Sequence, residues 1–285
     1  MAGKVFLLGV GCQKGATSWV SRYLRNHEAV DMGFAKEYHI FDALYVQSLR
    51  EFRVRVEREA TSILEGGTVD SDRAWSIFKK LEFFHRPESY IDYFDYLAMR
   101  NHEVRLVGDI TPSYAALPES AFRWLREGLT ARGFTVRVLF IMRDPVDRVC
   151  SSVRFGRKRS KHASKKSLSE EVNERYSTKA QRLRTEYQHT IRNLESVFSS
   201  EELHFAFYES LFSATSIMQV MRFLDLTYYE PDFEVRVNAS QEDEVVPDVI
   251  LKDVANYYTD TYMFVAQRYG AEAVRRLWPS YSMLE

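Results

Sequence analysis

A short run of basic, small and hydroxyl-bearing residues follows the first apolar segment of the chain. The run consists of Lys14, Gly15, Ala16, Thr17, Ser18 and Trp19. If it joins a strand at residues 5–10 to a helix that begins at Thr17, the first backbone N–H groups of that helix lack partners and point at a ligand. Gly15 would let the backbone approach an anion, Thr17 and Ser18 would add hydroxyl donors, and Lys14 would add a mobile positive charge. The run therefore predicts a phosphate-type anion site.

The run differs from the Walker A loop of nucleoside-triphosphate hydrolases. That loop reads G-x-x-x-x-G-K-[ST], with a hydroxyl after the lysine to bind magnesium. Here Lys14 precedes Gly15, and no glycine lies five residues ahead of a Gly-Lys pair. A conventional NTPase is disfavoured, and a nucleotide kinase or NTPase with a degenerate P-loop is the first alternative function.

A second candidate site begins at Arg143, directly after an apolar run at residues 136–142. Asp144 suits an N-cap position, and Asp147 suits the positive end of the helix dipole. Arg143 would then project from the carboxyl edge of a sheet, where α/β folds bind ligands, and its planar guanidinium suits a phosphate. Ser151 lies two helical turns beyond Asp144 on the same face. An ion pair of Arg143 with Asp144 or Asp147 is the structural alternative.

Apolar runs and helical spacing predict the elements that position these residues. A glycine-bounded apolar run at residues 5–10 is typical of a strand buried on both faces of a parallel sheet. Further strands are expected at 30–34, 104–107, 136–142 and 203–207, and helices at 17–25, 183–198 and 251–269. Alternating strands and helices, with no linker rich in Pro, Gly or Ser, predict a single α/β domain over residues 1–285. Its sheet would be P-loop-like, mainly parallel and flanked by helices.

Composition excludes several classes of protein. The chain has 285 residues, of which 45% are hydrophobic and 28% charged, which excludes collagen, disordered tails and small disulfide scaffolds. A net charge of −1 disfavours a generally basic nucleic-acid or membrane binder. No apolar run reaches the roughly 18 residues of a membrane span, and the first residues lack a secretory signal pattern. Cys12 and Cys150 favour reduced thiols, so a cytoplasmic protein is expected.

Two stretches have no motif. Between residues 81 and 99 lies an aromatic cluster, which predicts either a helix packed on the core or the lid of an acceptor pocket: Phe83, Phe84, Tyr90, Tyr93, Phe94 and Tyr96. Residues 154–166 hold seven Lys or Arg, which predicts a solvated loop or a loop that faces a polyanion. A non-enzymatic polyanion-binding module that uses 154–166 is thus the second alternative function.

Five blocks, in order, resemble the sulfotransferase family that uses 3′-phosphoadenosine 5′-phosphosulfate (PAPS). Residues 14–19 resemble its 5′-phosphosulfate loop, K-x-G-T-[ST] or K-G-G-T, and 143–151 resemble its 3′-phosphate motif, an arginine followed eight residues later by a serine. Residues 36–41, 108–114 and 207–211 resemble K-E-x-H-F-F, G-E-K-[ST]-P-x-Y and Y-E-D-L of the glycosaminoglycan-type branch. That branch's C-terminal disulfide and basic cofactor-clamping loop have no counterpart, and an acidic run at 242–244 stands there instead.

The resemblance implies transfer of a sulfuryl group from PAPS to a hydroxyl, less often an amine, with 3′-phosphoadenosine 5′-phosphate (PAP) as product. Glu37 would be the base and His39 would orient the acceptor or assist, whereas their structural alternative is a satisfied polar pair beside a strand end. They are spaced i, i+2, so an extended backbone would place both on one face. Lys14 would stabilise charge on the departing phosphate.

The same resemblance assigns the cofactor contacts. Residues 14–19 would bind the 5′-phosphosulfate, Arg143 and Ser151 the 3′-phosphate, and Tyr208 would belong to the cofactor site. The expected acceptor is a carbohydrate or another small hydroxylated metabolite, with no nucleic acid as partner. No metal is implied, because no His, Cys or Asp cluster has ligand spacing.

Overall fold

The structure is a computed structural model that describes residues 3–159, 165–234 and 244–284. Its described strands form a five-stranded, wholly parallel sheet in the order β2-β3-β1-β4-β5. The strands are β1 (Lys4–Gly11), β2 (Val30–Asp31), β3 (Leu106–Ile110), β4 (Phe134–Met142) and β5 (Leu203–Phe207). β1 lies between β3 and β4, so the chain order reverses at β1. An open parallel sheet binds ligands at such a switch point, beyond the carboxyl ends of its strands.

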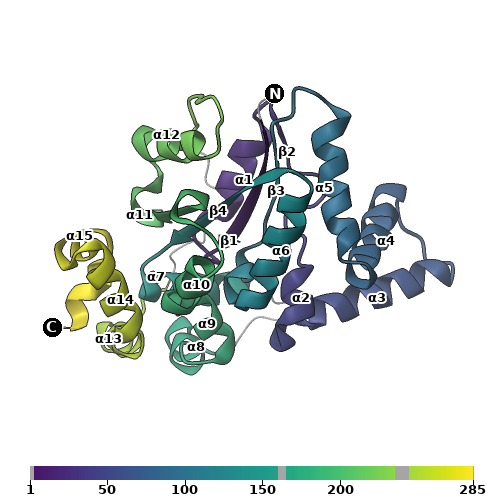
Figure 1. The fold of residues 1–285 in the computed structure, drawn as a ribbon. Helices are drawn as coiled ribbons and strands as arrows, with labels where there is room; N and C mark the ends of the chain where they lie inside the picture. Colours follow the sequence, from purple (N-terminus) through teal and green to yellow (C-terminus); the bar gives the residue numbers. More distant parts are fainter. Residues whose placement is uncertain (1–2, 160–164, 235–243, 285) are drawn as a thin grey trace.

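Helices surround this sheet (Figure 1). Those up to the end of β4 are α1 (Thr17–Arg25), α2 (Phe41–Tyr45), α3 (Glu51–Leu64), α4 (Ser71–His85), α5 (Glu88–Arg100) and α6 (Glu119–Ala131). Those after it are α7 (Pro145–Arg159), α8 (Leu168–Arg175), α9 (Lys179–Thr185), α10 (Tyr187–Glu195), α11 (Tyr208–Leu211), α12 (Ala214–Phe223), α13 (Asp248–Tyr257), α14 (Thr259–Tyr269) and α15 (Ala271–Leu277). Short 3₁₀ turns are η1 (Gln47–Leu49), η2 (Pro112–Ala116), η3 (Ser200–Glu202) and η4 (Pro279–Leu284).

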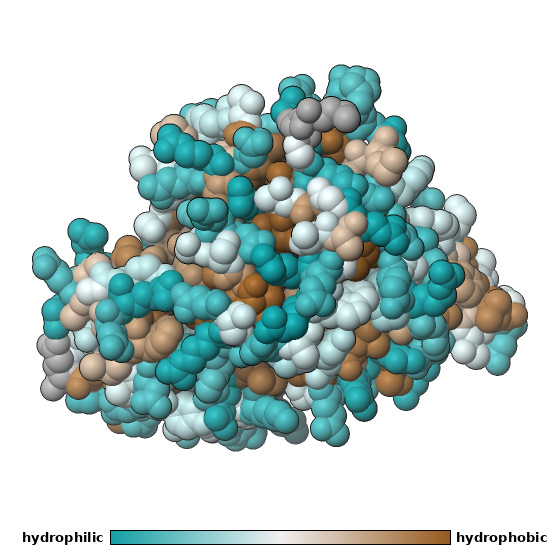
Figure 2. Space-filling view, viewed as in Figure 1, coloured by the Kyte–Doolittle hydropathy of each residue, from teal (hydrophilic) through white to brown (hydrophobic). Residues whose placement is uncertain are grey.

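Both faces of the sheet are buried. Successive side chains of a strand point to opposite faces, and β1 follows that period. Phe6 and Leu8 belong to a hydrophobic cluster that includes side chains of α5, α6 and α10. Val5 and Leu7 belong to a second cluster with side chains of α1 and α12. Helices therefore cover both faces, which confirms the predicted single α/β domain with a parallel sheet flanked by helices. Outside, hydrophilic side chains dominate the face shown in Figure 2.

The predicted elements hold best where the sequence has one strong signal. The strand at residues 5–10, the helix at 17–25 and the strands near 136–142 and 203–207 are confirmed. The strand predicted at 30–34 stops at Asp31, and the one predicted at 104–107 runs instead from Leu106 to Ile110. The single helices predicted at 183–198 and 251–269 are wrong. The chain turns at Glu186, between α9 and α10, and at Tyr258, between α13 and α14. The helices on both sides of each turn bury apolar faces in one core, so the apolar periodicity continues across the turn.

The aromatic cluster packs in the core. Phe83, Tyr90 and Phe94 are fully buried at the end of α4 and along α5, whereas Tyr96 is exposed. The core interpretation of residues 81–99 is therefore confirmed.

The basic stretch 154–166 is not a loop throughout. Residues 154–159 continue α7, residues 160–164 lie outside the described residues, and Gly156 does not interrupt the helix. Arg157 pairs with Glu244 at 2.9 Å and Lys166 with Glu174 at 2.5 Å, so part of this positive charge is neutralised. Of the acidic run at 242–244, residues 242 and 243 lie outside the described residues.

The C-terminal elements fix the start of α7. The Asp144 carboxylate caps the helix by accepting from Val146 N at 2.9 Å, and it also accepts from the Tyr262 hydroxyl and Ser280 N. Glu209 accepts from Asp144 N at 2.8 Å and from the indole of the fully buried Trp278 at 3.0 Å. The predicted N-cap is confirmed, and these contacts hold the backbone from which Arg143 projects.

Cys12 and Cys150 are free thiols, both buried, as expected. None of the helices in the described ranges combines the length and the apolar character needed to cross a membrane.

Candidate functional site

A cavity of about 1110 Å³ lies beyond the carboxyl ends of β1, β3 and β4. Loops that follow these strands contribute Lys14, Ser113 and Arg143 to its lining, and α3, α4, α7 and α9 complete the wall. Besides His39, the lining holds seven Lys or Arg side chains and three carboxylates. The basic ones are Lys14, Lys36, Arg55, Lys80, Arg143, Arg159 and Arg184, and the carboxylates are Glu37, Asp42 and Glu51. The chain as a whole has a net charge of −1, so this local excess of positive charge favours the binding of anions in the cavity.

The loop between β1 and α1 has the backbone of an anion cradle. Lys14 and Ala16 have φ of 72° and 63°, whereas Gly15 between them does not lie in the left-handed region. This alternation turns successive N–H groups toward one concavity, and no side chain among the described residues caps α1. A Cβ on Gly15 would lie 3.0 Å from Cys12 O and from Ile141 O, so the loop packs closely on the strand ends.

Lys14 supplies the charge of this loop. Its ammonium lies 4.2 Å from the centre of the Phe155 ring, and it lines the cavity. Burial and the nearby charge of Arg143 lower the pKa of Lys14 to about 8. A bound anion would reverse this destabilisation of the ammonium, because an opposite charge favours the charged form.

Arg143 lies beside the loop. Its Nη1 donates to Lys14 O at 3.1 Å, and its guanidinium lies 4.3 Å from the centre of the Tyr208 ring, while its buried Nε has no partner among the described residues. The alternative ion pair with Asp144 or Asp147 does not occur in the described structure. Ser151, 7% exposed, lines the same cavity. A guanidinium with an unused N–H and a hydroxyl that line the same cavity are suited to a phosphate.

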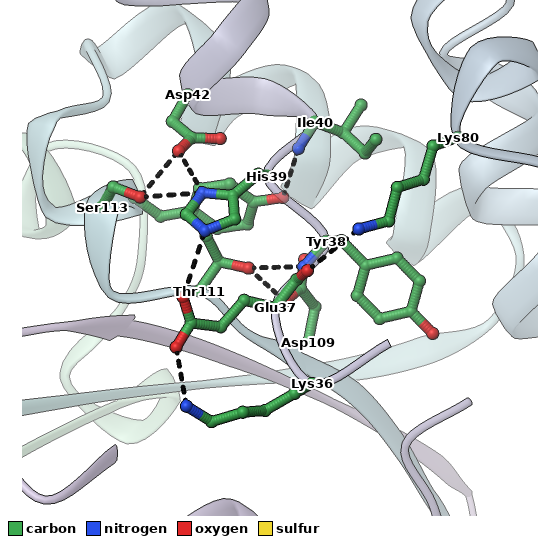
Figure 3. A network of polar contacts seen from close by, with 11 residues as sticks. Lys36, Glu37, Tyr38, His39, Ile40, Asp42, Lys80, Asp109, Thr111 and Ser113 are labelled. Carbon is green, nitrogen blue, oxygen red and sulfur yellow. Dashed lines mark hydrogen bonds and ion pairs between the residues drawn. The ribbon is translucent and has the colours of Figure 1, made fainter. Parts of the chain in front are cut away.

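A network of acid and base groups lies in the same cavity (Figure 3). His39 Nδ1 lies 2.7 Å from Asp42 Oδ2, and His39 Nε2 lies 3.1 Å from Glu37 Oε2. Ser113 Oγ donates to the same Asp42 oxygen at 2.6 Å, and Lys36 donates to the other oxygen of Glu37 at 3.0 Å. The predicted proximity of Glu37 and His39 is therefore found, but the extended backbone assumed for it is wrong, because His39 has a φ of 58°.

The network sets opposite pKa shifts. Burial by itself lowers the pKa of His39, but hydrogen bonds to Asp42 and Glu37 and their charges outweigh it and raise that pKa to about 9. Burial by itself raises the pKa of Glu37, but the hydrogen bond with His39 and the charge of Lys36 lower it to about 2. At neutral pH His39 is therefore an imidazolium held between two carboxylates, and Glu37 is ionised.

The segment after β3 anchors the segment that carries this network. Thr111 Oγ1 donates to the buried Asp109 at 2.6 Å and accepts from Tyr38 N at 3.0 Å. The Tyr90 hydroxyl donates to the other Asp109 oxygen at 3.0 Å, and Tyr114 accepts from Ile40 N at 3.4 Å. Backbone groups on both sides of His39 are thus tied to β3 and η2, which orients the imidazole.

The structure gathers the predicted site residues. The cavity lining includes Lys14, Ala16, Thr17, Ser18, Trp19, Glu37, His39, Arg143, Ser151 and Tyr208. Gly15 does not line the cavity. It allows the loop to pack closely on the strand ends instead. Sequence reasoning missed Asp42, Ser113, Phe212 and Phe233, which also line the cavity. Ser113 lies inside a block that the sequence analysis had quoted, whereas the other three had no recognisable local signal. No cluster of three or more His, Cys, Asp or Glu suited to a metal ion occurs in the described part of the chain.

Comparison with known proteins decides the family. The sequence model of the sulfotransferase domain matches residues 5–245, most of the chain. The chain belongs to the sulfotransferase family. A sulfotransferase is a transferase of sulfuryl groups, and the cavity lies within the matched residues. A search of curated protein sequences gave no match.

A solved structure of a sulfotransferase shares the fold, and two others match with lower scores. A sulfotransferase from Alicyclobacillus acidocaldarius is 17% identical with a TM-score of 0.56, over 94% of this chain and 96% of that one. The sulfotransferase domain of the Synechococcus PCC 7002 olefin synthase is 15% identical with a TM-score of 0.45, over 88% and 86%. The sulfotransferase domain from the curacin biosynthetic pathway is 15% identical with a TM-score of 0.45, over 82% and 77%. The first likeness supports the fold of this sulfotransferase.

Proposed function

We propose that this sulfotransferase transfers a sulfuryl group from PAPS to a hydroxyl, less often an amine, of a carbohydrate or another small hydroxylated metabolite. One observation carries the proposal: the Lys14 loop, Arg143 with Ser151, and the Glu37–His39 pair line one positive cavity. In the reaction, the acceptor oxygen forms a bond to sulfur while the bond from sulfur to the bridging phosphate oxygen breaks. The acceptor's proton passes to a base, and PAP leaves.

Each part of PAPS has a matching surface. The cradle at residues 14–17 suits the 5′-phosphosulfate, with Lys14 stabilising charge on the departing oxygen. Arg143 and Ser151 suit the 3′-phosphate, and Tyr208 supports the Arg143 guanidinium through its ring. Trp19, Phe212 and Phe233 line the same cavity, and the Trp19 ring stacks on that of Phe233 at 5.9 Å. These aromatic rings suit an adenine base.

The protonation states distinguish Glu37 from His39 as the candidate base. Glu37 is ionised at neutral pH and can accept the acceptor's proton, whereas His39 is already protonated and cannot. His39 then holds Glu37 in place by donating its Nε2–H to Glu37 Oε2. Asp42 and Ser113 act through His39 as positioning residues.

Transfer of labelled sulfur tests the function. The chain is incubated with ³⁵S-PAPS and a panel of phenols, sugars and amines, and both PAP and labelled products are separated. We expect PAP release to match labelled ester or sulfamate formed with at least one acceptor class. Labelled sulfur that stays in PAPS across the whole panel would contradict the proposal.

Arg143→Ala should weaken the binding of PAP more than the binding of 5′-AMP. Loss of a charged hydrogen-bond donor to phosphate costs about 1.5–3 kcal/mol, which lowers PAP affinity roughly tenfold to a hundredfold. The affinity for 5′-AMP, which lacks the 3′-phosphate, should change little. Calorimetric titration of both nucleotides into wild type and variant measures the ratio. An equal loss for PAP and AMP would assign Arg143 to loop support through Lys14 O instead.

Binding of PAP should weaken above pH 8. The pKa of Lys14 is about 8 in the free protein, and a bound 5′-phosphate raises it, so the complex holds more protons than the free protein above that pH. The contribution of Lys14 to the affinity should therefore be nearly constant below about pH 7 and fall, by at most tenfold per unit, as the pH rises beyond 8. Titrations of wild type and Lys14→Met over the same pH range isolate the effect of Lys14, because the titration of His39, whose pKa is about 9, is common to both proteins. A fall of equal slope in the variant would contradict the assignment.

A further inference from the structure

We infer that the acceptor carries an anionic group (a carboxylate, sulfate or phosphate ester) and that Arg55 and Lys80, with Arg184 on a third helix, bind that group. The inference rests on the proposed function, because it concerns the acceptor end of the same cavity. Arg55 comes from α3, Lys80 from α4 and Arg184 from α9, and all three line the cavity.

Phe52 connects two of these cations to the acid–base network. The Phe52 ring centre lies 4.7 Å from that of His39. The Arg55 guanidinium and the Lys80 ammonium each lie 4.9 Å from the same ring. Lys80 also donates to the backbone carbonyl of Glu37 at 3.3 Å, which ties its ammonium to the segment that carries the base. An anionic group bound here would lie next to the hydroxyl that Glu37 deprotonates.

These cations lack the ion pairs of their neighbours. Arg53 pairs with Glu57 at 2.7 Å, and Lys79 pairs with Glu82 at 2.8 Å. Within the described ranges Arg55 and Lys80 pair with no carboxylate, although both lie on the same two helices as those pairs. Burial lowers the pKa of Lys80, so the protein destabilises an ammonium that an anion would stabilise.

Arg184 adds an unsatisfied guanidinium. Its Nη1 donates to Ala180 O at 2.6 Å, but its buried Nε has no hydrogen-bond partner among the described residues. Its charge interacts with Asp42, and α9 packs on η2, which carries Ser113, so Arg184 lies on the acid–base side of the cavity. Buried polar groups are normally hydrogen-bonded, and an orphaned guanidinium N–H is costly. A bound anion would supply the missing acceptor.

The cofactor does not use these three cations in the proposed arrangement. Its phosphates lie at Lys14 and Arg143, at the ends of β1 and β4, whereas the three cations reach the cavity from the helices α3, α4 and α9. Their positive charge therefore remains available for the acceptor after PAPS has bound. A neutral acceptor would leave three cations uncompensated around the reacting group.

The test compares matched acceptors on the PAP complex of the full chain. The probes are glucuronate against glucose, and 4-hydroxyphenylacetate against 4-hydroxyphenylethanol, with dissociation constants from ligand-observed NMR. We expect the anion of at least one pair to bind about tenfold or more tightly than its neutral partner, as one charge-assisted contact of about 1.5–3 kcal/mol provides. Equal binding within both pairs, or no binding of either anion, would overturn the inference.

Two variants and a control assign the preference to the named residues. Arg55→Met, which does not contact Glu37, and Lys80→Met should each reduce the preference about threefold or more, while Lys79→Met on the same helix should preserve it. A preference unchanged in both variants would overturn the assignment. PAP affinity separates the two levels of failure: if the wild-type chain does not bind PAP, the proposed function fails, and if it binds PAP without discriminating the pairs, only this inference fails.

Discussion

Replacement of Glu37 by glutamine is expected to lower sulfuryl-transfer turnover about 10²- to 10⁴-fold, the usual contribution of a positioned base. The substitution removes the carboxylate of Glu37, which is ionised at neutral pH and more exposed to the cavity than the buried Asp42 at the other end of the network. Glutamine has nearly the shape of glutamate, so the hydrogen bond with His39 and the fold should persist. Turnover of ³⁵S-PAPS with a saturating acceptor measures the effect.

Two controls separate the loss of a base from a loss of structure. PAP affinity should remain that of the wild type in Glu37→Gln, because Glu37 does not contact the proposed phosphate sites. Glu37→Asp keeps the carboxylate but moves it back, and it should retain more turnover than the glutamine variant. If Glu37→Gln binds PAP normally and turns over at nearly the wild-type rate, Glu37 is not the base.

Lys14→Ala is expected to lower turnover about 10²- to 10³-fold, by analogy with the loss of one donor that stabilises charge in a transition state. The negative charge of the leaving phosphate grows as the sulfur–oxygen bond breaks, and Lys14 is the cation of the loop that we propose binds this phosphate. The substitution should therefore lower turnover by a larger factor than it lowers the affinity for PAP. Single-turnover rates and PAP titrations on the same preparations measure the two separately.

Lys158 on α7 offers a matched control for Lys14. It lies near enough to lower the pKa of Lys14 through its charge, but it does not line the cavity. Lys158→Ala should leave turnover within about twofold of the wild type, as surface substitutions usually do. Equal losses in the two variants would mean that the general positive potential, and not the position of Lys14, governs the rate.

Part of the fold and of the site could be predicted because single segments carry strong local signals. The glycine-bounded apolar run of β1 and the amphipathic pattern of α1 fix the loop between them, and this loop positions Lys14 and Thr17. Asp144 was predicted as an N-cap from its place after an apolar run, and the structure confirms that role. These predictions depend only on neighbours in sequence.

Residues from other segments could not be predicted, because their roles depend on tertiary packing. Arg184 reaches the cavity only because α9 packs on η2, and the turn at Glu186 that separates α9 from α10 leaves no break in the apolar period. Asp42 becomes the partner of His39 only because the left-handed backbone at His39 turns the imidazole toward it. Phe233 reaches Trp19 from far along the chain.

The most direct measurement of the proposed chemistry is calorimetric titration of PAP into the metal-free chain, with ATP plus magnesium in a parallel titration. In the proposed arrangement the Lys14 loop binds one phosphate, and Arg143 with Ser151 binds a second in the same cavity. We therefore predict tight binding of the 3′,5′-bisphosphate without metal and much weaker binding of ATP. Binding of ATP with magnesium in preference to PAP would indicate a nucleotide kinase or NTPase and would contradict the use of PAPS.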